Sequence, residues 1–227
     1  MKKYFLYIVL TRTNTVMSKA IQLVKKDEYT HAAIALDKKL KHMYSFGRKY
    51  TYFPFIGRFK QENFNTGIYK FNKSLPVIII ELEVSRQQHE KAKHLLDQFI
   101  ANSRLYKYNY KGLLHCLLNK SASCDHRFLC SEFVYYILKE SGIVDFRIPR
   151  NLVRPQSLLN LEGRIVYQGT IRMYQRPQPK LNRQATADYT DYHRLPGFIN
   201  RRILKKLFPR SSRMFTEFRV KKYGRTG

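Results

Sequence analysis

His31 and Cys130 are the two side chains whose types and settings best fit nucleophilic chemistry. His31 begins an apolar run that ends at Leu36, a pattern typical of a buried strand. Cys130 begins an amphipathic run that ends at Glu140, which predicts a helix. An imidazole can take the proton of a thiol, and the free N–H groups of a helix N-terminus stabilise a thiolate. We therefore predict that Cys130 is a nucleophile and that His31 is its base.

The predicted elements orient both side chains toward a shared space. On the helix, Cys130 lies on the same side as the core-facing residues that follow it, which are Phe133, Val134, Ile137 and Leu138. On the strand, His31 shares its face with Ala33 and Ala35, whose small side chains leave room for another group. A free cysteine is more often a small buried hydrophobe, and a lone histidine is more often a core residue, so that alternative stays open.

The other cysteines and histidines fit catalysis less well. Cys116 lies in an apolar helical pattern and Cys124 lies in a polar loop, while His42 faces away from His31 by strand alternation. With His126, the three cysteines offer four zinc ligands, but their spacing lacks the close cysteine pair of structural sites. The chain has no phosphate-binding loop and no dinucleotide fingerprint. We expect neither a metal nor a cofactor.

A third polar group usually fixes the ring of a catalytic histidine. If strands 31–37 and 42–48 form a hairpin centred on Lys38, Ser45 lies opposite His31 on the same face. We predict that Ser45 orients the ring, with Glu62 as the less favoured alternative.

The remaining pattern predicts an α+β fold, because strands and helices follow one another without regular βαβ spacing. The predicted strands are 4–11, 31–36, 43–46, 67–71 and 76–84, with a final strand pair of 164–167 and 170–173. The predicted helices are 18–25, a helix capped by Ser85 and Gln88, 111–118 and 130–140. Residues 47–60 are predicted to form a loop. We expect one domain over 1–176 and a basic, irregular extension over 177–227 that holds a helical segment at 198–208.

The charge of the chain is strongly basic, with 43 Lys and Arg against 16 Asp and Glu. Such a surface attracts nucleic acid, anionic lipid or acidic polymers without choosing among them. Three cysteines outside any disulfide framework indicate a reducing compartment, and no apolar stretch approaches the length of a membrane helix. We expect a cytoplasmic protein without a transmembrane segment.

Residues 30–36, 43–48 and 128–134, with 11–15 and 154–158, resemble a known family. They are similar to the circularly permuted branch of the NlpC-type papain-like superfamily, in which the histidine strand precedes the cysteine helix. That branch includes permuted papain-like amidases and the lecithin retinol acyltransferase group. The resemblance covers about residues 3–170.

The resemblance implies a permuted papain-like fold, an antiparallel sheet packed against helices, with Cys130 as nucleophile and His31 as base. The third polar residue of the family, usually His, Glu or Asn on the strand after the histidine, maps near Ser45. A serine at this position departs from the family pattern.

We predict a cysteine-dependent hydrolase or acyltransferase, similar to an amidase or peptidase, that acts on an amide- or ester-containing substrate through an acyl-enzyme. The alternative prediction is a non-catalytic protein of the same fold that binds an anionic partner, nucleic acid or a membrane surface, through its basic surface and tail. The sequence does not indicate which acyl group is the substrate.

Overall fold

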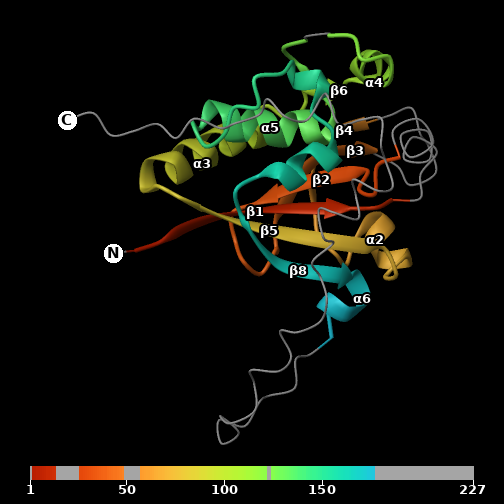
Figure 1. Ribbon diagram of the computed structural model, residues 1–227, viewed down its shortest axis with the longest axis vertical. Coiled ribbons are helices and arrows are strands. Elements are labelled where there is room, and N and C mark those ends of the chain that lie inside the picture. The colour runs from red at the N-terminus through yellow and green to blue at the C-terminus, as the bar shows by residue number, and fades with distance from the viewer. Residues whose placement is uncertain (1, 14–25, 49–56, 122–123, 177–227) are drawn as a thin grey trace, which may run out of the picture. The chain divides into compact units, whose positions relative to one another are not determined.

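The computed structural model describes residues 2–13, 26–48, 57–121 and 124–176 (Figure 1). In spatial order, the strands of this part of the chain are β7 (Arg127–Phe128), β6 (Lys107–Tyr108), β4 (Gly57–Glu62), β3 (Met43–Arg48), β2 (His31–Ala35), β1 (Tyr4–Thr11), β5 (Pro76–Val84) and β8 (Arg164–Thr170). They form one open sheet, in which the short β6–β7 pair is parallel and the other pairs are antiparallel. The fold class is α+β, as predicted.

Helices cover both faces of this sheet. The helices of the described residues are α2 (Gly67–Phe71), α3 (Arg86–Ala101), α4 (Tyr110–Leu117), α5 (Cys130–Glu140) and α6 (Ile171–Tyr174), with 3₁₀ turns at Arg150–Leu152 and Pro155–Asn160. Figure 1 shows α3 and α5 side by side over one face of the sheet. Tyr69 of α2 and Ile171 of α6 are buried against the other face.

The alternation of side chains along each strand divides the interior into two cores. From β1, Leu6, Ile8 and Leu10 pack in the core that contains α3 and α5, whereas Tyr7 and Val9 pack in the opposite core. The first core also gathers a cluster of aromatic rings: Phe46, Phe59, Phe99, Phe128 and Phe133. This cluster fixes α5 against the sheet, because Phe133 is on α5 and Phe46 and Phe59 are on neighbouring strands.

Most of the predicted elements are confirmed. The strand predictions 4–11, 43–46 and 76–84 fall within β1, β3 and β5, and the predicted strand 31–36 ends one residue early, in β2. The capping box is present, since the Ser85 side chain accepts from the Gln88 N–H at 3.1 Å and Gln88 Oε1 accepts from the Ser85 N–H at 2.9 Å. The predicted helices 111–118 and 130–140 correspond to α4 and α5.

Three predictions of local structure are wrong. Residues 67–71 form a helix rather than a strand; Gly67 starts it with φ +56°, and only Tyr69 is buried. Residues 164–170 form one strand, β8, because they pair along β5, and Thr170 then caps α6 by accepting from the Met173 N–H. The predicted loop 47–60 contains the start of β4, which pairs with β3 from Gly57 onward.

Some predictions lie outside the described residues. These are the helix 18–25, the extension 177–227 and its helical segment 198–208, so the predicted boundary at 176 stays a prediction. Within the residues that the structure describes, no helix combines the length and the apolar character needed to cross a membrane.

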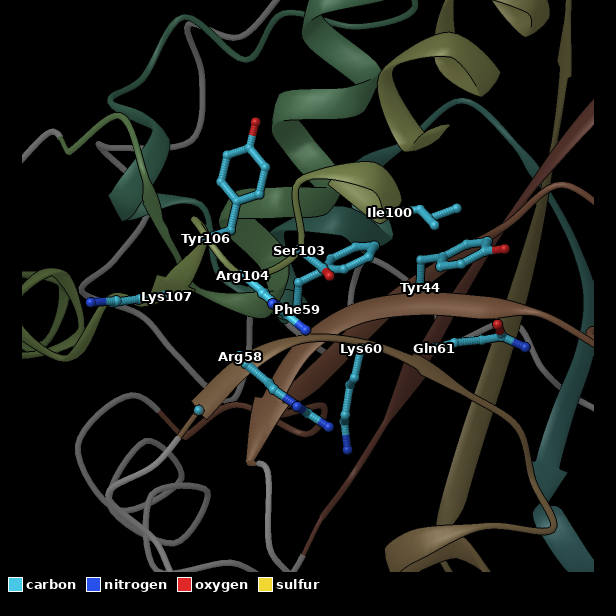
Figure 2. Close-up of a pocket in the computed structure, with 11 residues that line it drawn as sticks. Tyr44, Arg58, Phe59, Lys60, Gln61, Ile100, Ser103, Arg104, Tyr106 and Lys107 are labelled. Atoms are coloured by element: carbon cyan, nitrogen blue, oxygen red, sulfur yellow. The ribbon is translucent and has the colours of Figure 1, made fainter. Parts of the chain in front are cut away.

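A pocket opens where β4 and β6 separate. These two strands pair only at Arg58 and Lys107. Beyond that pair the chain at 100–106 lies apart from β4, which leaves a cavity of about 540 Å³ between them (Figure 2).

Candidate active site

The N-terminus of α5 is held in place by a buried carboxylate. Glu132, the third residue of the helix, accepts the Leu129 N–H at 3.0 Å and the Asn109 side-chain amide at 3.2 Å through Oε2. Its other carboxylate oxygen, Oε1, accepts a hydrogen bond from Arg150 Nε at 3.0 Å. Glu132 therefore satisfies a free N–H of the helix start and fixes the residue before Cys130.

The position of His31 follows from the pairing of β2 with β1. His31 is opposite Thr11, and the Thr30 N–H donates to the Thr11 carbonyl at 3.0 Å. Ala33 and Ala35 pack in the second core, on the face of β2 that His31 shares by alternation. The prediction that small residues flank His31 on this face is confirmed.

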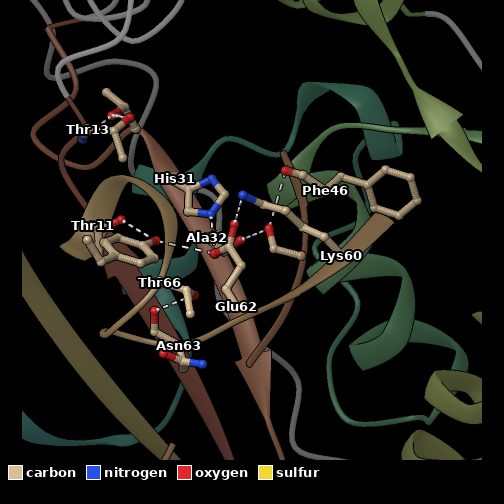
Figure 3. A network of polar contacts seen from close by, with 12 residues as sticks. Thr11, Thr13, His31, Ala32, Phe46, Lys60, Glu62, Asn63 and Thr66 are labelled. Atoms are coloured by element: carbon tan, nitrogen blue, oxygen red, sulfur yellow. Dashed lines mark hydrogen bonds and ion pairs between the residues drawn. The ribbon is translucent and has the colours of Figure 1, made fainter. Parts of the chain in front are cut away.

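Glu62, at the end of β4, holds the imidazole ring. Nε2 of His31 lies 3.0 Å from Glu62 Oε2, which also accepts from the Tyr69 hydroxyl at 3.3 Å. The other carboxylate oxygen, Oε1, lies 2.9 Å from Lys60 Nζ. Figure 3 shows His31 and Lys60 reaching the Glu62 carboxylate from different directions. The carboxylate thus has a partner on both oxygens, although its side chain is only 5% exposed.

Tyr69 connects this network to β1. Its hydroxyl lies 3.3 Å from Thr11 Oγ1. Since the tyrosine proton is donated to Glu62, Thr11 donates to the tyrosine oxygen. The contact joins α2, β1 and β4 around the carboxylate, and it limits the positions that the carboxylate can adopt.

The two residues predicted to form the nucleophilic pair lie together. Cys130 is close enough to the imidazole of His31 to contribute, as a side-chain partner, to the raised pKa of this histidine. Because Glu62 occupies Nε2, Nδ1 is the ring nitrogen that remains for the thiol. The three groups therefore follow one another as thiol, imidazole and carboxylate. The thiol comes from α5, the imidazole from β2 and the carboxylate from β4.

The charges around His31 favour its protonated form. Burial alone would lower the pKa of His31, but the Glu62 carboxylate and the hydrogen bond to Cys130 outweigh burial and raise this pKa to about 10. Burial would raise the pKa of the Glu62 carboxyl, but His31 and Lys60 hold it well below its usual range. At neutral pH the site therefore contains an imidazolium at His31 and a carboxylate at Glu62.

The structure does not place Ser45 as predicted. Ile34 pairs with Tyr44 and Ala35 with Met43, two residues out of the register expected for a turn centred on Lys38. The turn is longer because Leu40 adopts φ +51° and is buried in the second core. Ser45 Oγ instead donates to the Ala32 carbonyl at 2.6 Å, so its side chain hydrogen-bonds to the backbone of β2 and not to the His31 ring.

The substitution Ser45→Ala is expected to reduce stability without reducing the reactivity of Cys130. Loss of the hydrogen bond to the Ala32 carbonyl should lower the free energy of unfolding by about 1 kcal/mol, measured by urea denaturation. The rate of Cys130 alkylation by iodoacetamide should stay within about twofold of wild type, because Ser45 is not a partner of the ring. A large loss of alkylation rate at unchanged stability would contradict this assignment.

A second segment supports the strand that carries His31. Gln156 Oε1 accepts from the backbone N–H groups of Glu28 at 3.0 Å and Tyr29 at 3.2 Å, just before β2. Arg154 forms an ion pair with the buried Asp27. Residues 154–158 were included in the sequence resemblance, and here they fix the approach of the chain to His31.

Glu62 is the second choice in the sequence-based prediction, which includes neither Lys60 nor Tyr69. The period-two signal was present, because Lys60 and Glu62 alternate with the buried Phe59. That signal was hidden by Pro54 and Gly57, which favoured a loop. The sequence predicts a strand at residues 67–71, and a strand does not predict the direction of the Tyr69 side chain on the helix that forms there.

The chain also contains cysteines and other possible metal ligands. Among the described residues, no three His, Cys, Asp or Glu side chains are grouped so that they could hold a metal ion. Cys116, Cys124 and Cys130 are not joined in disulfides, and Cys116 and Cys130 are buried. Comparisons with protein-family models, with curated proteins and with solved structures found no match.

Proposed function

We propose that this chain is a cysteine-dependent hydrolase or acyltransferase of the permuted papain-like type, acting on an amide or ester through an acyl-enzyme. One observation carries the proposal: a buried carboxylate holds Nε2 of the His31 ring, and Cys130 at the start of α5 is near enough to act on the same ring. A nucleophile, a base and an orienting group in this order are the components of thiol acyl transfer.

The order of elements also favours the permuted papain-like arrangement. The strand with His31 precedes the helix with Cys130, and the intervening chain supplies β4 with the third polar group. A glutamate in the third position fits the pattern of the family better than the predicted serine does. The antiparallel strands around β2 and the packing of α5 against β2 and β3 agree with such a core.

In acylation, the Cys130 thiolate attacks the carbonyl carbon of the substrate, and the carbonyl electrons move to oxygen. The backbone N–H of Cys130 has no acceptor within the helix, so it can donate to this oxyanion. When the tetrahedral intermediate collapses, the bond to the leaving amine or alcohol breaks. The His31 imidazolium gives its proton to the leaving group, and the acyl group remains on sulfur.

In deacylation, His31 is neutral and takes a proton from water or from an acceptor alcohol or amine. The resulting nucleophile attacks the thioester, and the thiolate leaves. Glu62 keeps Nε2 of the ring protonated, so that Nδ1 faces the reacting atoms throughout.

The cation at His31 would stabilise a negative charge that forms on the Cys130 sulfur during the reaction. Glu62 holds this cation in place, because its carboxylate contacts both His31 and Lys60.

The proposal is tested by trapping the acyl-enzyme. After a brief reaction with p-nitrophenyl acetate and an acid quench, mass spectrometry is expected to find one acetyl group on the peptide that contains Cys130. The variant Cys130→Ala should lose this adduct, whereas Cys124→Ala should keep it, because Cys124 lies outside the contacts with His31. Acetylation spread over several residues, or acetylation that persists in Cys130→Ala, would overturn the proposal.

A further inference from the structure

The pocket beside β4 is lined by cations. Arg58 and Lys60 extend from alternate positions of β4, and Arg104 and Lys107 contribute from the opposite wall. None of the residues that line this pocket is an aspartate or a glutamate. The volume of about 540 Å³ lies within the range of functional ligand sites.

Three of these cations are not neutralised by carboxylates. Among the residues that the structure describes, Arg58, Arg104 and Lys107 form no ion pair, whereas Lys60 is held by Glu62. Cations gathered on the two walls of one groove produce a positive potential that attracts anions. The residues that supply this potential all lie within the described part of the chain.

Aromatic rings accompany the cations. Figure 2 shows Tyr44 and Tyr106 apart from each other with Arg104 between them, whereas Arg58 and Lys60 point away from β4 on its other side. Both tyrosines are half-buried, and each ring packs on a core phenylalanine. Tyr106 stacks on Phe99 at 4.2 Å between ring centroids, and Tyr44 is parallel to Phe59 at 6.0 Å. The rings are therefore held in position before any ligand arrives, which lowers the entropic cost of stacking.

We propose that this groove binds single-stranded nucleic acid, with Arg58, Arg104 and Lys107 at the phosphates and Tyr44 and Tyr106 against the bases. A basic groove bordered by fixed aromatic rings is the arrangement that binds single strands without sequence preference. An acidic peptide would use the cations and leave the rings without a function. Cys130, His31 and Glu62 do not line the groove, although Lys60 both lines it and contacts Glu62. The proposal does not require that Cys130 be a nucleophile.

The test measures binding of a short fluorescein-labelled oligothymidylate to the full chain by anisotropy over a range of salt concentrations. The double variant Arg58→Gln, Arg104→Gln is expected to weaken binding about 10-fold at low salt and to reduce the salt slope by about 1.4. The matched double variant Arg86→Gln, Arg172→Gln removes the same charge from exposed positions on α3 and α6. It should weaken binding less than about threefold.

Three results would overturn the proposal. The oligonucleotide could fail to bind even at low salt, or the two double variants could weaken binding equally, which would indicate diffuse attraction. Polyglutamate of equal charge could also displace the oligonucleotide as well as unlabelled oligothymidylate does, which would make the groove a site for acidic peptides.

Discussion

Replacing His31 with glutamine is expected to slow acetylation of Cys130 by p-nitrophenyl acetate by about 100-fold or more at pH 7. Glutamine keeps a polar side chain at the position but carries no positive charge, so a thiolate at Cys130 would lose its cation. The release of p-nitrophenolate in a rapid-mixing experiment reports this rate.

The same variant is expected to lengthen the lifetime of any acetyl-enzyme that does form, because no imidazole is present to activate water. A purely structural role for His31 would not predict this second effect, which quenched mass spectrometry can follow over time. The control is His94→Gln, an exposed histidine on α3, which should leave both rates unchanged. Equal slowing in the two variants would contradict the role assigned to His31.

Replacing Glu62 with glutamine is expected to lower the free energy of unfolding by about 3–5 kcal/mol. The amide keeps the shape of the side chain, but it leaves Lys60 and the His31 imidazolium close together without a carboxylate. Denaturation by urea at pH 6 measures the loss. The variant Glu83→Gln removes an exposed ion pair with Lys3, and it should change stability by less than about 1 kcal/mol.

The stabilisation by Glu62 also depends on pH in a defined direction. The pKa of His31 is raised from 6.5 to about 10 on folding, so its contribution is complete below pH 6.5 and is lost as pH rises through 10. The pKa of Glu62 is lowered from 4.5, so its contribution is present above pH 4.5 and is lost in acid.

The stability difference between wild type and Glu62→Gln should therefore be largest between pH 4.5 and 6.5 and should narrow toward pH 10. Urea denaturation of both proteins at pH 6 and near pH 10 measures this difference in the free energy of unfolding. A difference that stays constant or grows toward pH 10 would contradict the assignment of Glu62 as the group that raises the pKa of His31.

The sequence alone determined the elements whose signals are local. The β-branched run of β5, the capping box at Ser85 and the apolar stripe after Cys130 each specify a structure through neighbours a few residues away. The same local patterns placed His31 at a strand start and Cys130 at a helix start, so the two members of the candidate pair could be predicted.

Only the tertiary structure decided the third member. Whether Ser45 or Glu62 reaches the His31 ring depends on two features of the sheet. These are the register of the β2–β3 hairpin and the presence of a strand at residues 57–62. The register depends on how Leu40 packs into the second core, and β4 is stabilised by Phe59 among the rings of distant helices. Contacts between residues far apart in the chain set both outcomes, and local propensity carries no information about such contacts.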